Sequence, residues 1–493
     1  MAAVPESPKA RLVRGTAWSF TATALTKIAF VVNSIVVARL LGVTQFGIFA
    51  LLTSSLGLVG LVAGLGISGA MVKYVAQYDT KSRSRLAPLI STAMSLVCVT
   101  AGISAIALIF IAGPLALGVY NEPRLVEMLM VASIPLFVNA FSAPLFSVLQ
   151  GFQKIREMSL RNIVVTFISV PITIGLVYVW GLWGTVFAII TGAFIGLAVN
   201  LGIILKLLRE KNVKLRVGFD RSEVKTIFSY AMPLLLVGLV VSPVSWVVLT
   251  MLQHFHGADA VGYYSVANSL ASSLLLIPTA ISTPMIPLVS ELDIRDRERM
   301  QSMSSKVLRM TFLFFLPMAL ALAMFSRLAL EILYGSGYVG AWQVLYMLCA
   351  GTFLIAADNV IVIVLLGTGR MWVSFGLNVT WMISLLATAS LLVPSYAEIG
   401  LGTAYLVSQT VYTAVILAYA HRKLGIVLHD MEVVLLIAAF GFGLAVIPSF
   451  LVQGWLSYLA GLGVLAAIAV GEAVVLQKHE WDFLRGILRR VSR

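Results

Sequence analysis

Fourteen stretches of about 20 apolar residues divide the sequence, and they constrain its fold more than any other feature. A helix of about 20 apolar residues crosses the hydrocarbon core of a membrane, because each residue advances it by about 1.5 Å. Hydrocarbon offers the backbone no hydrogen bonds, which favours helices that satisfy their own. The sequence therefore predicts an all-α polytopic membrane protein with about 14 transmembrane helices. Their predicted ranges are 15–40, 46–71, 87–112, 125–149, 162–180, 183–205, 226–252, 261–286, 309–329, 341–366, 372–394, 400–420, 431–453 and 455–476.

The composition and the loops argue against a soluble enzyme. Of 493 residues only 11% are charged, whereas a globular protein has about 25%. No gap between predicted spans exceeds roughly 20 residues, which leaves no room for a soluble catalytic domain. The motifs GxxxxGK[ST] and HExxH are absent, and Cys98 and Cys349 lie far apart without metal-ligand spacing. We expect no enzymatic activity, no cofactor and no metal site.

The basic residues indicate which side of the membrane the loops occupy. Of the 34 Lys and Arg, 30 fall in the two tails or in the loops on the side of the N-terminus. Short loops rich in these residues stay in the cytoplasm. The sequence therefore predicts a multi-pass protein of the cytoplasmic membrane with both termini cytoplasmic. The net charge of +13 then faces anionic membrane lipids, and nucleic acid is not an expected partner.

An internal repeat of about 215 residues organises the chain. The pattern G-x4-G-x-aromatic occurs at 42–49 and again at 257–264. Further along, Gly151, Lys154 and Asn162 correspond to Gly367, Arg370 and Asn378, and two outward loops end in Tyr120 and Tyr334. Two units with six helices each would share one orientation in the membrane. We predict two parallel six-helix lobes followed by two C-terminal helices.

The predicted parts follow from the spans, the charges and the repeat. They are a cytoplasmic tail at 1–14, a first six-helix lobe at 15–205, a cytoplasmic linker at 206–225, a second six-helix lobe at 226–420, two additional helices at 421–476 and a basic amphipathic cytoplasmic tail at 477–493.

The first two helices resemble those of a known family. Arg39-Leu-Leu-Gly42 leads into Phe46-Gly47-Ile-Phe49, and the following helix ends at Lys73-Tyr74-Val-Ala. These segments resemble the opening of the polysaccharide and oligosaccharide flippases of the multidrug/oligosaccharidyl-lipid/polysaccharide exporter superfamily. The resemblance implies two six-helix lobes around a V-shaped cavity, which moves lipid-diphosphate-linked saccharides by alternating access. Twelve helices are common in that family. The related flippases for a lipid-linked peptidoglycan precursor have fourteen, and their last pair forms a groove for the lipid tail.

Two helices that the resemblance places along the cavity carry stripes of polar residues. On the first helix the stripe lies within about 120° of arc and contains Ser19, Thr23, Thr26, Lys27, Asn33 and Ser34. The eighth helix carries Ser265, Asn268, Ser269, Ser272, Thr279 and Thr283. Such stripes either line a cavity or mediate close helix packing. Following the resemblance, the predicted substrate-binding residues are Thr23, Lys27, Asn33, Asn268 and Ser272.

Two charged residues within predicted spans are the sharpest candidates. Lys27 costs about 2.5 to 3.5 kcal/mol to insert at mid-span, and the substrate's diphosphate is the anion that would offset this cost. A structural ion pair or snorkelling to the headgroups would also account for Lys27. Asp358 is the one carboxylate deep inside a helix of the two repeated units. It would bind a coupling ion, a proton or Na⁺, or else neutralise Lys27.

We therefore expect a flippase for a lipid-diphosphate-linked oligosaccharide or polysaccharide precursor. Its partners would be that substrate, membrane lipids and a coupling H⁺ or Na⁺. The first alternative is a cation-coupled drug or small-solute exporter of the same superfamily. A membrane-embedded saccharide polymerase is the third reading, and the short outward loops with few carboxylates argue against it.

Overall fold

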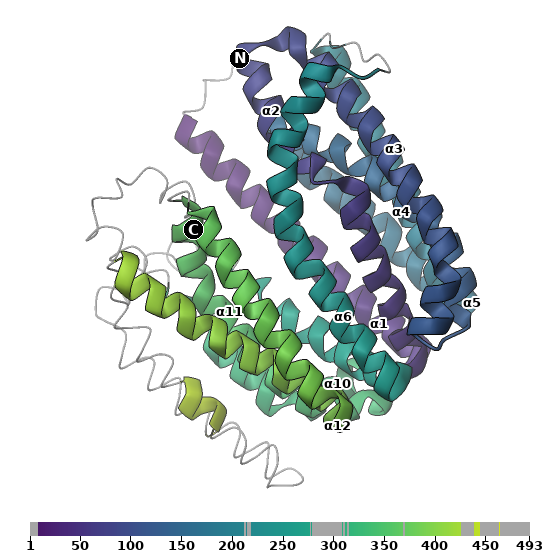
Figure 1. The fold of residues 1–493 in the computed structure, drawn as a ribbon, viewed down its shortest axis with the longest axis vertical. Helices are drawn as coiled ribbons and strands as arrows, with labels where there is room; N and C mark the ends of the chain where they lie inside the picture. The colour runs from purple at the N-terminus through teal and green to yellow at the C-terminus, as the bar shows by residue number, and fades with distance from the viewer. Residues whose placement is uncertain are drawn as a thin grey trace, which may run out of the picture. The chain divides into compact units, whose positions relative to one another are not determined.

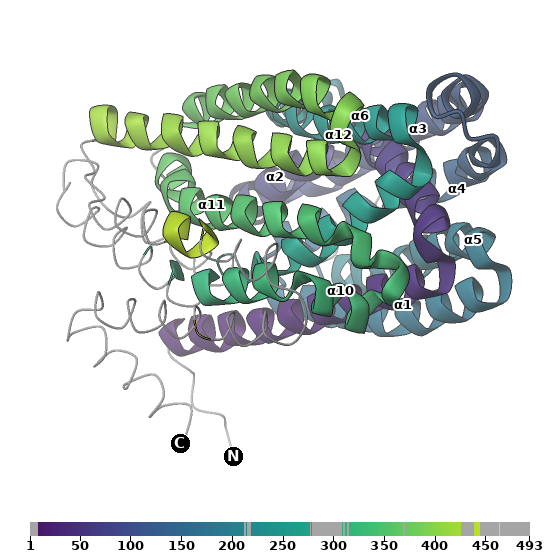
Figure 2. The same ribbon diagram turned by 90° about the horizontal axis from the view of Figure 1, so that it is seen from below.

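The computed structural model is helical, with no strand in the residues that it describes (Figure 1, Figure 2). These residues are 8–211, 213, 218–276, 278, 308, 311–312, 315–367, 370–424, 438–443 and 463. The helices are α1 (Pro8–Gly64), α2 (Ile67–Lys81), α3 (Leu86–Gly113), α4 (Arg124–Gly151), α5 (Ile155–Glu210), α6 (Arg221–Ser273), α10 (Ser326–Tyr334), α11 (Trp342–Gly367) and α12 (Met371–Tyr419). Shorter helical turns are η1 (Arg83–Arg85), η2 (Pro114–Val119), η3 (Ser336–Ala341) and η4 (Ala420–Leu424).

Four of the helices are long enough for two membrane crossings. Each bends at one residue with non-helical backbone angles, namely Gly42 in α1, Gly181 in α5, Gly257 in α6 and Ala397 in α12. Seven helices in the described chain are long and apolar enough to span a membrane, or eight with a bent pair around Phe325. If each of the four bent helices counts as two spans and the bent pair at Phe325 counts as one, the described residues hold twelve. These twelve match the first twelve predicted ranges, and the prediction of a polytopic all-α protein is confirmed.

Some predicted boundaries differ from the structure. The predicted ninth span, 309–329, is not continuous, because 315–324 and α10 meet at Phe325 with a bend of 78°. The predicted second span, 46–71, is interrupted at Leu65 and Gly66, both at positive φ, before α2 begins. The thirteenth and fourteenth predicted helices and the tail at 477–493 lie outside the described residues, apart from a helical piece at 438–443 and Gly463. Their structure stays a prediction.

The backbone repeats with the spacing that the sequence predicts. Gly42 and Gly257 have φ/ψ of 74°/174° and 78°/−175°. Gly181 and Ala397, which are 216 residues apart, have 54°/−127° and 51°/−133°. α5 and α12 also begin 216 residues apart, at Ile155 and Met371. Four bends at matching positions with matching angles indicate that one structural unit occurs twice along the chain.

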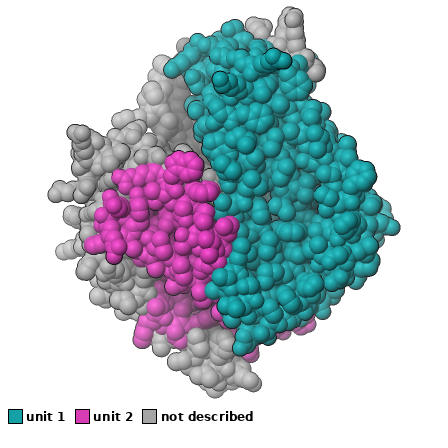
Figure 3. Space-filling view, viewed as in Figure 1, with its two compact units in different colours: residues 1–269, 386–401 teal, residues 270–385, 402–493 magenta. Residues whose placement is uncertain are grey.

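The chain divides into two compact units, coloured separately in Figure 3. Unit 1 comprises Met1–Ser269 with Leu386–Leu401, and unit 2 comprises Leu270–Leu385 with Gly402–Arg493. Within unit 1, the first arm of α6 packs closely on α2, since a methyl group at Gly66 would lie 2.6 Å from the carbonyl oxygen of Ala231. The lobe boundaries at 205 and 226 are not tested by this division and stay a prediction.

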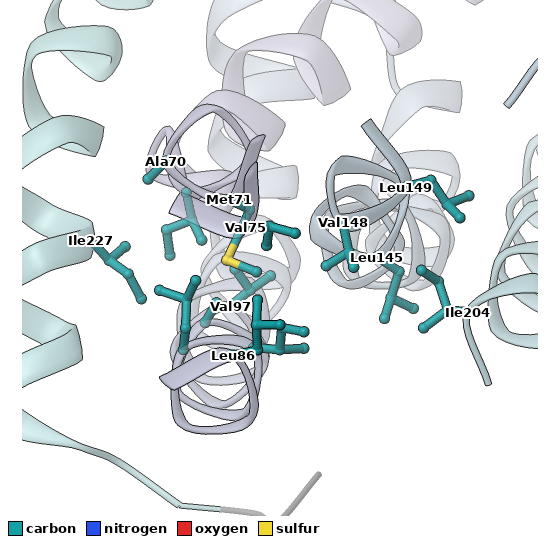
Figure 4. Close-up of a cluster of buried hydrophobic side chains, with 14 of the residues drawn as sticks. Ala70, Met71, Val75, Leu86, Val97, Leu145, Val148, Leu149, Ile204 and Ile227 are labelled. Atoms are coloured by element: carbon teal, nitrogen blue, oxygen red, sulfur yellow. The ribbon is translucent and has the colours of Figure 1, made fainter. Parts of the chain in front are cut away.

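The core of unit 1 is apolar and draws on six helices, α1 to α6. Figure 4 labels residues of this cluster. Met71 and Val75 of α2 lie among side chains of α3 and α4, and α5 and α6 add Ile204 and Ile227. Val148 of α4 is fully buried in the same cluster. Burying such side chains stabilises the bundle largely through close packing, because lipid tails are as apolar as the side chains themselves.

Candidate functional site

The polar stripe of α1 lies in the arm before the bend at Gly42. Lys27 is exposed and makes no ion pair with any described residue. Asn33 is half-buried, and its Oδ1 has no hydrogen-bond partner in the described part of the chain. Thr23 lies on the same helix one turn before Lys27, but its side chain is outside the described side chains. α1 therefore presents an exposed cation and an open amide acceptor about two turns apart.

The part of the second stripe from Ser265 to Ser272 lies on α6, and the structure brings it to the first; Thr279 and Thr283 lie outside the described residues. The hydroxyl of Ser34 lies 3.1 Å from that of Ser269, which joins two residues 235 positions apart in sequence. Asn268, the neighbour of Ser269, is half-buried. Ser272, three residues further along α6, is exposed. The sequence predicted a polar stripe on each helix. The structure shows in addition that the two stripes are in contact, through the hydrogen bond between Ser34 and Ser269.

A different polar site lies within unit 2, around Asp358 of α11. This side chain is 2% exposed. Its Oδ2 accepts hydrogen bonds from Gln409 Nε2 at 2.9 Å and from Thr413 Oγ1 at 2.8 Å. Its Oδ1 has no hydrogen-bond partner among the described residues. A buried carboxylate with one open oxygen and two neutral neighbours can bind a proton or a small hard cation, because carboxylate and hydroxyl oxygens are suitable ligands for both.

Gln409 and Thr413 were not among the predicted site residues. They are four residues apart on α12, so they lie on one face of that helix and reach the same carboxylate. The signal in the sequence is a pair of polar residues at helical spacing within an apolar span. That signal does not say which other helix the pair faces.

The two copies of the G-x4-G motif contact each other at the outward turns. A methyl group at Gly47 would overlap the carbonyl oxygen of Ala258, and one at Gly262 would overlap that of Val43. Thr44 also donates a hydrogen bond to Asp259. The contact is reciprocal. Gly47 meets Ala258 and Gly262 meets Val43, and Gly262 and Ala258 are the residues 215 positions after Gly47 and Val43. Glycine is needed at both crossings for the backbones to approach this closely.

Polar contacts also gather at the other end of unit 1. Arg85 pairs with Glu223 at 2.6 Å, and Lys211 pairs with Asp79 at 2.6 Å. Tyr78 donates a hydrogen bond to Glu223 over 3.2 Å. Burial raises the pKa of the Tyr78 phenol, and the charge of Glu223 raises it further. These contacts fasten the linker and the start of α6 to α2 and η1, on the side that the basic residues predict to be cytoplasmic.

A cavity of about 530 Å³ opens in unit 1 but contains none of the predicted site residues. Its lining includes Gln45, Arg124, Glu127, Trp180 and Trp183. Among the described residues, no group of three or more His, Cys, Asp or Glu is arranged to hold a metal ion.

The helices bend at repeated positions along the chain and carry buried polar groups in apolar spans. These features are typical of membrane transport proteins. A profile of the polysaccharide biosynthesis protein family matches residues 36–343, and the chain belongs to that family. The flippase family resemblance read from the first two helices is thereby confirmed.

Two relatives extend over most of the chain. A Shigella flexneri protein described as an O-antigen transporter is 20% identical over 424 residues, covering 84% of this chain and 98% of the relative. The EPS I polysaccharide export inner membrane protein EpsE of Ralstonia nicotianae is 25% identical over 378 residues, covering 73% of this chain and 82% of the relative.

Solved structures show the same fold. The lipid II flippase MurJ in an inward closed conformation matches with a TM-score of 0.75 at 13% identity, over 95% of this chain and 99% of that one. An inward-facing multidrug resistance MATE family transporter of the MOP superfamily matches with a TM-score of 0.65 at 14% identity, over 83% and 95%. The chain has the fold of this superfamily, which is the one that the sequence resemblance indicated.

Proposed function

We propose that this protein is a flippase that moves a lipid-diphosphate-linked oligosaccharide or polysaccharide precursor across the cytoplasmic membrane by alternating access. Membership of the polysaccharide biosynthesis family supports this, as do relatives named for O-antigen transport and polysaccharide export. In this proposal the protein is a transporter rather than an enzyme. Its two lobes are parallel and its termini are cytoplasmic.

The observation that carries the proposal is the contact between the polar stripes of α1 and α6. Ser34 and Ser269 join the stripes, and Asn33 beside them keeps an acceptor open. A saccharide presents many hydroxyl groups, and each would cost several kcal/mol if left unpaired in hydrocarbon. Two facing stripes of hydroxyl and amide groups supply the donors and acceptors that such a head group needs.

Lys27 would recognise the charged part of the substrate in this scheme. Its ammonium is exposed and without an ion pair in the described chain, so it is available to a ligand. A diphosphate supplies the negative charge that a mid-span cation requires. Thr23, Asn268 and Ser272 would contribute hydrogen bonds along the same two helices.

Asp358 would couple transport to an ion gradient. Its two donors from α12 orient the carboxylate, and its open oxygen would receive H⁺ or Na⁺. Binding a cation would cancel a buried charge, which gives the loaded and the empty states different free energies. Such a difference is what lets an ion gradient bias a conformational equilibrium.

A cation-coupled drug or small-solute exporter is the second candidate, and the similarity to a MATE family transporter favours it. The two candidate functions differ in the charge of the substrate, which is anionic for the flippase and cationic for an exporter of cationic drugs. An exporter of cationic drugs gains nothing from an exposed lysine in its cavity, whereas a diphosphate carrier does.

The test uses the purified protein in liposomes that contain a fluorescent undecaprenyl-diphosphate oligosaccharide. We expect the probe to cross the bilayer with wild-type protein, to stop with Lys27→Ala, and to cross more slowly with Lys27→Arg, which keeps the charge. Lys81→Ala, which removes an exposed lysine at the end of α2, is the control and should behave as wild type.

Two results would contradict the assignment. Transport of a cationic dye with no movement of the lipid-linked probe would favour the exporter. Recovery of activity in the double variant Lys27→Ala with Asp358→Ala, after loss in each single variant, would make Lys27 a neutralising partner rather than a substrate ligand.

A further inference from the structure

Arg161 lies in a polar slot between α4 and the two arms of α5. Its Nε donates to Asn200 Oδ1 at 3.0 Å, and its NH1 donates to Asn162 Oδ1 at 3.0 Å. Asn200 is 1% exposed, and its own Nδ2 donates to Ser142 Oγ at 2.7 Å. The guanidinium lies over the ring of Phe146, with 5.1 Å between its carbon and the ring centroid. Contacts from α4 and from both arms of α5 therefore hold this group in one orientation.

The slot holds a positive charge that no described carboxylate neutralises. Arg161 makes no ion pair within the described residues, and Glu157, one helical turn earlier, pairs with Lys154 at 3.6 Å. The guanidinium keeps its charge at any physiological pH. A half-buried cation surrounded by amides, a hydroxyl and an aromatic ring is incompletely compensated, and an anion is the group that would complete it.

The guanidinium also has donors to spare, and there is room beside them. Of its five N–H groups, two bond to the amides of Asn200 and Asn162. NH2 has no hydrogen-bond partner in the described chain. Gly196 faces it, and a methyl group at that position would lie 3.2 Å from NH2. NH2 and the second N–H of NH1 are left to donate, and arginine binds phosphate through such a pair of N–H groups.

The position along the helices suggests where the anion comes from. Arg161 lies six residues after α5 begins at Ile155, and Asn200 lies ten residues before α5 ends at Glu210. At about 1.5 Å per residue, the slot is roughly 9 to 15 Å from those helix ends. In the predicted orientation these ends are cytoplasmic, so the slot is within reach of phosphate groups in the inner leaflet.

The repeat shows that the fold itself does not require this charge. The residues 216 positions after Arg161 and Asn200 are Leu377 and Ile416, and both are buried apolar side chains. The second copy of the unit packs the same helices with apolar side chains at these two positions. The pair of Arg161 and Asn200 is therefore a feature of the first copy alone, which favours a role in binding over a role in folding.

We propose that Arg161, oriented by Asn200 and Asn162, binds the phosphate group of a membrane amphiphile. Two sources share this chemistry, a phospholipid headgroup and an isoprenyl diphosphate. The site is separate from Lys27, and its occupation does not depend on the protein being a flippase.

The experiment measures binding of three probes to the purified full-length protein in neutral detergent. The probes are phosphatidylglycerol, geranylgeranyl diphosphate and, as a phosphate-free amphiphile, diacylglycerol. We expect Arg161→Leu, which installs the residue of the second copy, to lower affinity for a phosphate probe about tenfold or more. Arg161→Lys should lose less, since it keeps the charge but not the fork. Arg156→Leu removes an exposed arginine of the same helix and should change little.

Asn200→Asp separates binding from folding. It places a carboxylate 3.0 Å from Arg161 Nε, so it should abolish phosphate binding while the thermal unfolding temperature stays level or rises. If the variants lose affinity for phosphatidylglycerol alone, the site binds a lipid headgroup. If they lose affinity for geranylgeranyl diphosphate alone, the site binds the lipid-linked substrate. The proposal is overturned if Arg161→Leu and Asn200→Asp both fold and bind all three probes as wild type, or if diacylglycerol loses affinity equally.

Discussion

The two copies of the repeated unit place polar residues at the same point and give them opposite chemistry. Ser142 of α4 and Asp358 of α11 are 216 residues apart, and both are buried. Ser142 accepts a hydrogen bond from Asn200, which in turn holds the cation Arg161. Asp358 is itself the charged group, with Gln409 as one of two neutral donors. The first copy thus encloses a cation and the second an ionisable carboxyl group.

The partners show how the two sites diverged. Asn200 corresponds to Ile416, and Thr413 corresponds to Leu197, so at each of these two positions the polar partner in one copy is an apolar residue in the other. The duplicated helices determine where a polar group can be buried, and the side chains at that point determine its charge. In our proposals the first site recognises phosphate and the second binds a coupling cation. In these proposals one repeated backbone supplies two sites of different function.

The largest effect should come from Asp358→Asn, compared with Ser142→Ala. The amide keeps the size of the carboxylate and loses its charge, so we expect gradient-driven accumulation to fall by about tenfold or more while downhill exchange survives. Ser142→Ala, at the corresponding point, should leave coupling unchanged. Accumulation and exchange are measured in the same liposomes, with and without an imposed ion gradient.

Accumulation that persists in the Asp358→Asn variant would make this carboxylate structural. Coupling lost to the same extent with Ser142→Ala would remove the distinction between the two copies.

A smaller effect is expected from Thr413→Val. This change keeps the shape of the side chain and removes one of the two donors to Asp358. Mutating a residue that orients a ligand typically lowers affinity for the bound ion about 10- to 100-fold without abolishing binding. The concentration of H⁺ or Na⁺ that gives half-maximal transport should therefore rise. Thr410→Val, on an exposed part of the same helix, is the control, and an equal shift there would indicate a general effect on α12.

Much of the fold could be predicted from the sequence, because the membrane imposes a length and a composition on every span. The first twelve ranges, the repeat and the burial of Asp358 all follow from apolar runs and their interruptions. The break at Phe325 was not predicted this way, since no Gly or Pro marks it and the predicted span 309–329 ran through Ser326 and Arg327, which follow it. The break before α2 is marked by Gly66, but a glycine inside an apolar run is equally common in a continuous span.

The partners of the candidate site residues could not be predicted from the sequence, because they depend on how helices rotate against one another. Gln409 and Thr413 reach Asp358 only after the chain reverses at Ala397 and returns along α12. Arg161 stands one residue before a predicted span, so the sequence groups it with the cytoplasmic charges. Only the packing of α4 against both arms of α5 shows it held inside the bundle.

Ser142→Asp would carry the carboxylate of the second copy into the first. The new side chain would lie beside Asn200, one hydrogen bond away from Arg161, and would supply the counter-ion that the slot lacks. We expect the free energy of unfolding to rise by about 1 kcal/mol, because a charge that is now uncompensated becomes paired. Phosphate binding should fall at the same time. Thermal unfolding in detergent measures the first effect, and a clear decrease in stability would show that Arg161 is already neutralised.

The smallest expected effect concerns the two matching bends, where Gly181 and Ala397 share nearly the same backbone angles. At φ 51° and ψ −133°, Ala397 has a conformation that a side chain disfavours by about 1 to 3 kcal/mol. Ala397→Gly should remove this strain, and after subtracting about 0.4 to 1 kcal/mol for the greater freedom of glycine in the unfolded chain it should stabilise by about 1 kcal/mol.

Gly181→Ala should destabilise by a similar amount. The nearest atom to the added methyl group would be Gln45 Oε1 at 3.8 Å, so no clash contributes and the backbone alone sets the sign. Gly175→Ala, in a regular part of the same helix with no atom within 4 Å of the added group, is the matched control. It should stabilise by up to about 1 kcal/mol, because alanine is the better helix former. Thermal unfolding measures both variants. If Gly181→Ala and Gly175→Ala shift stability in the same direction, alanine is not strained at position 181. The backbone angles shared with Ala397 would then not have the energetic cost assigned to them.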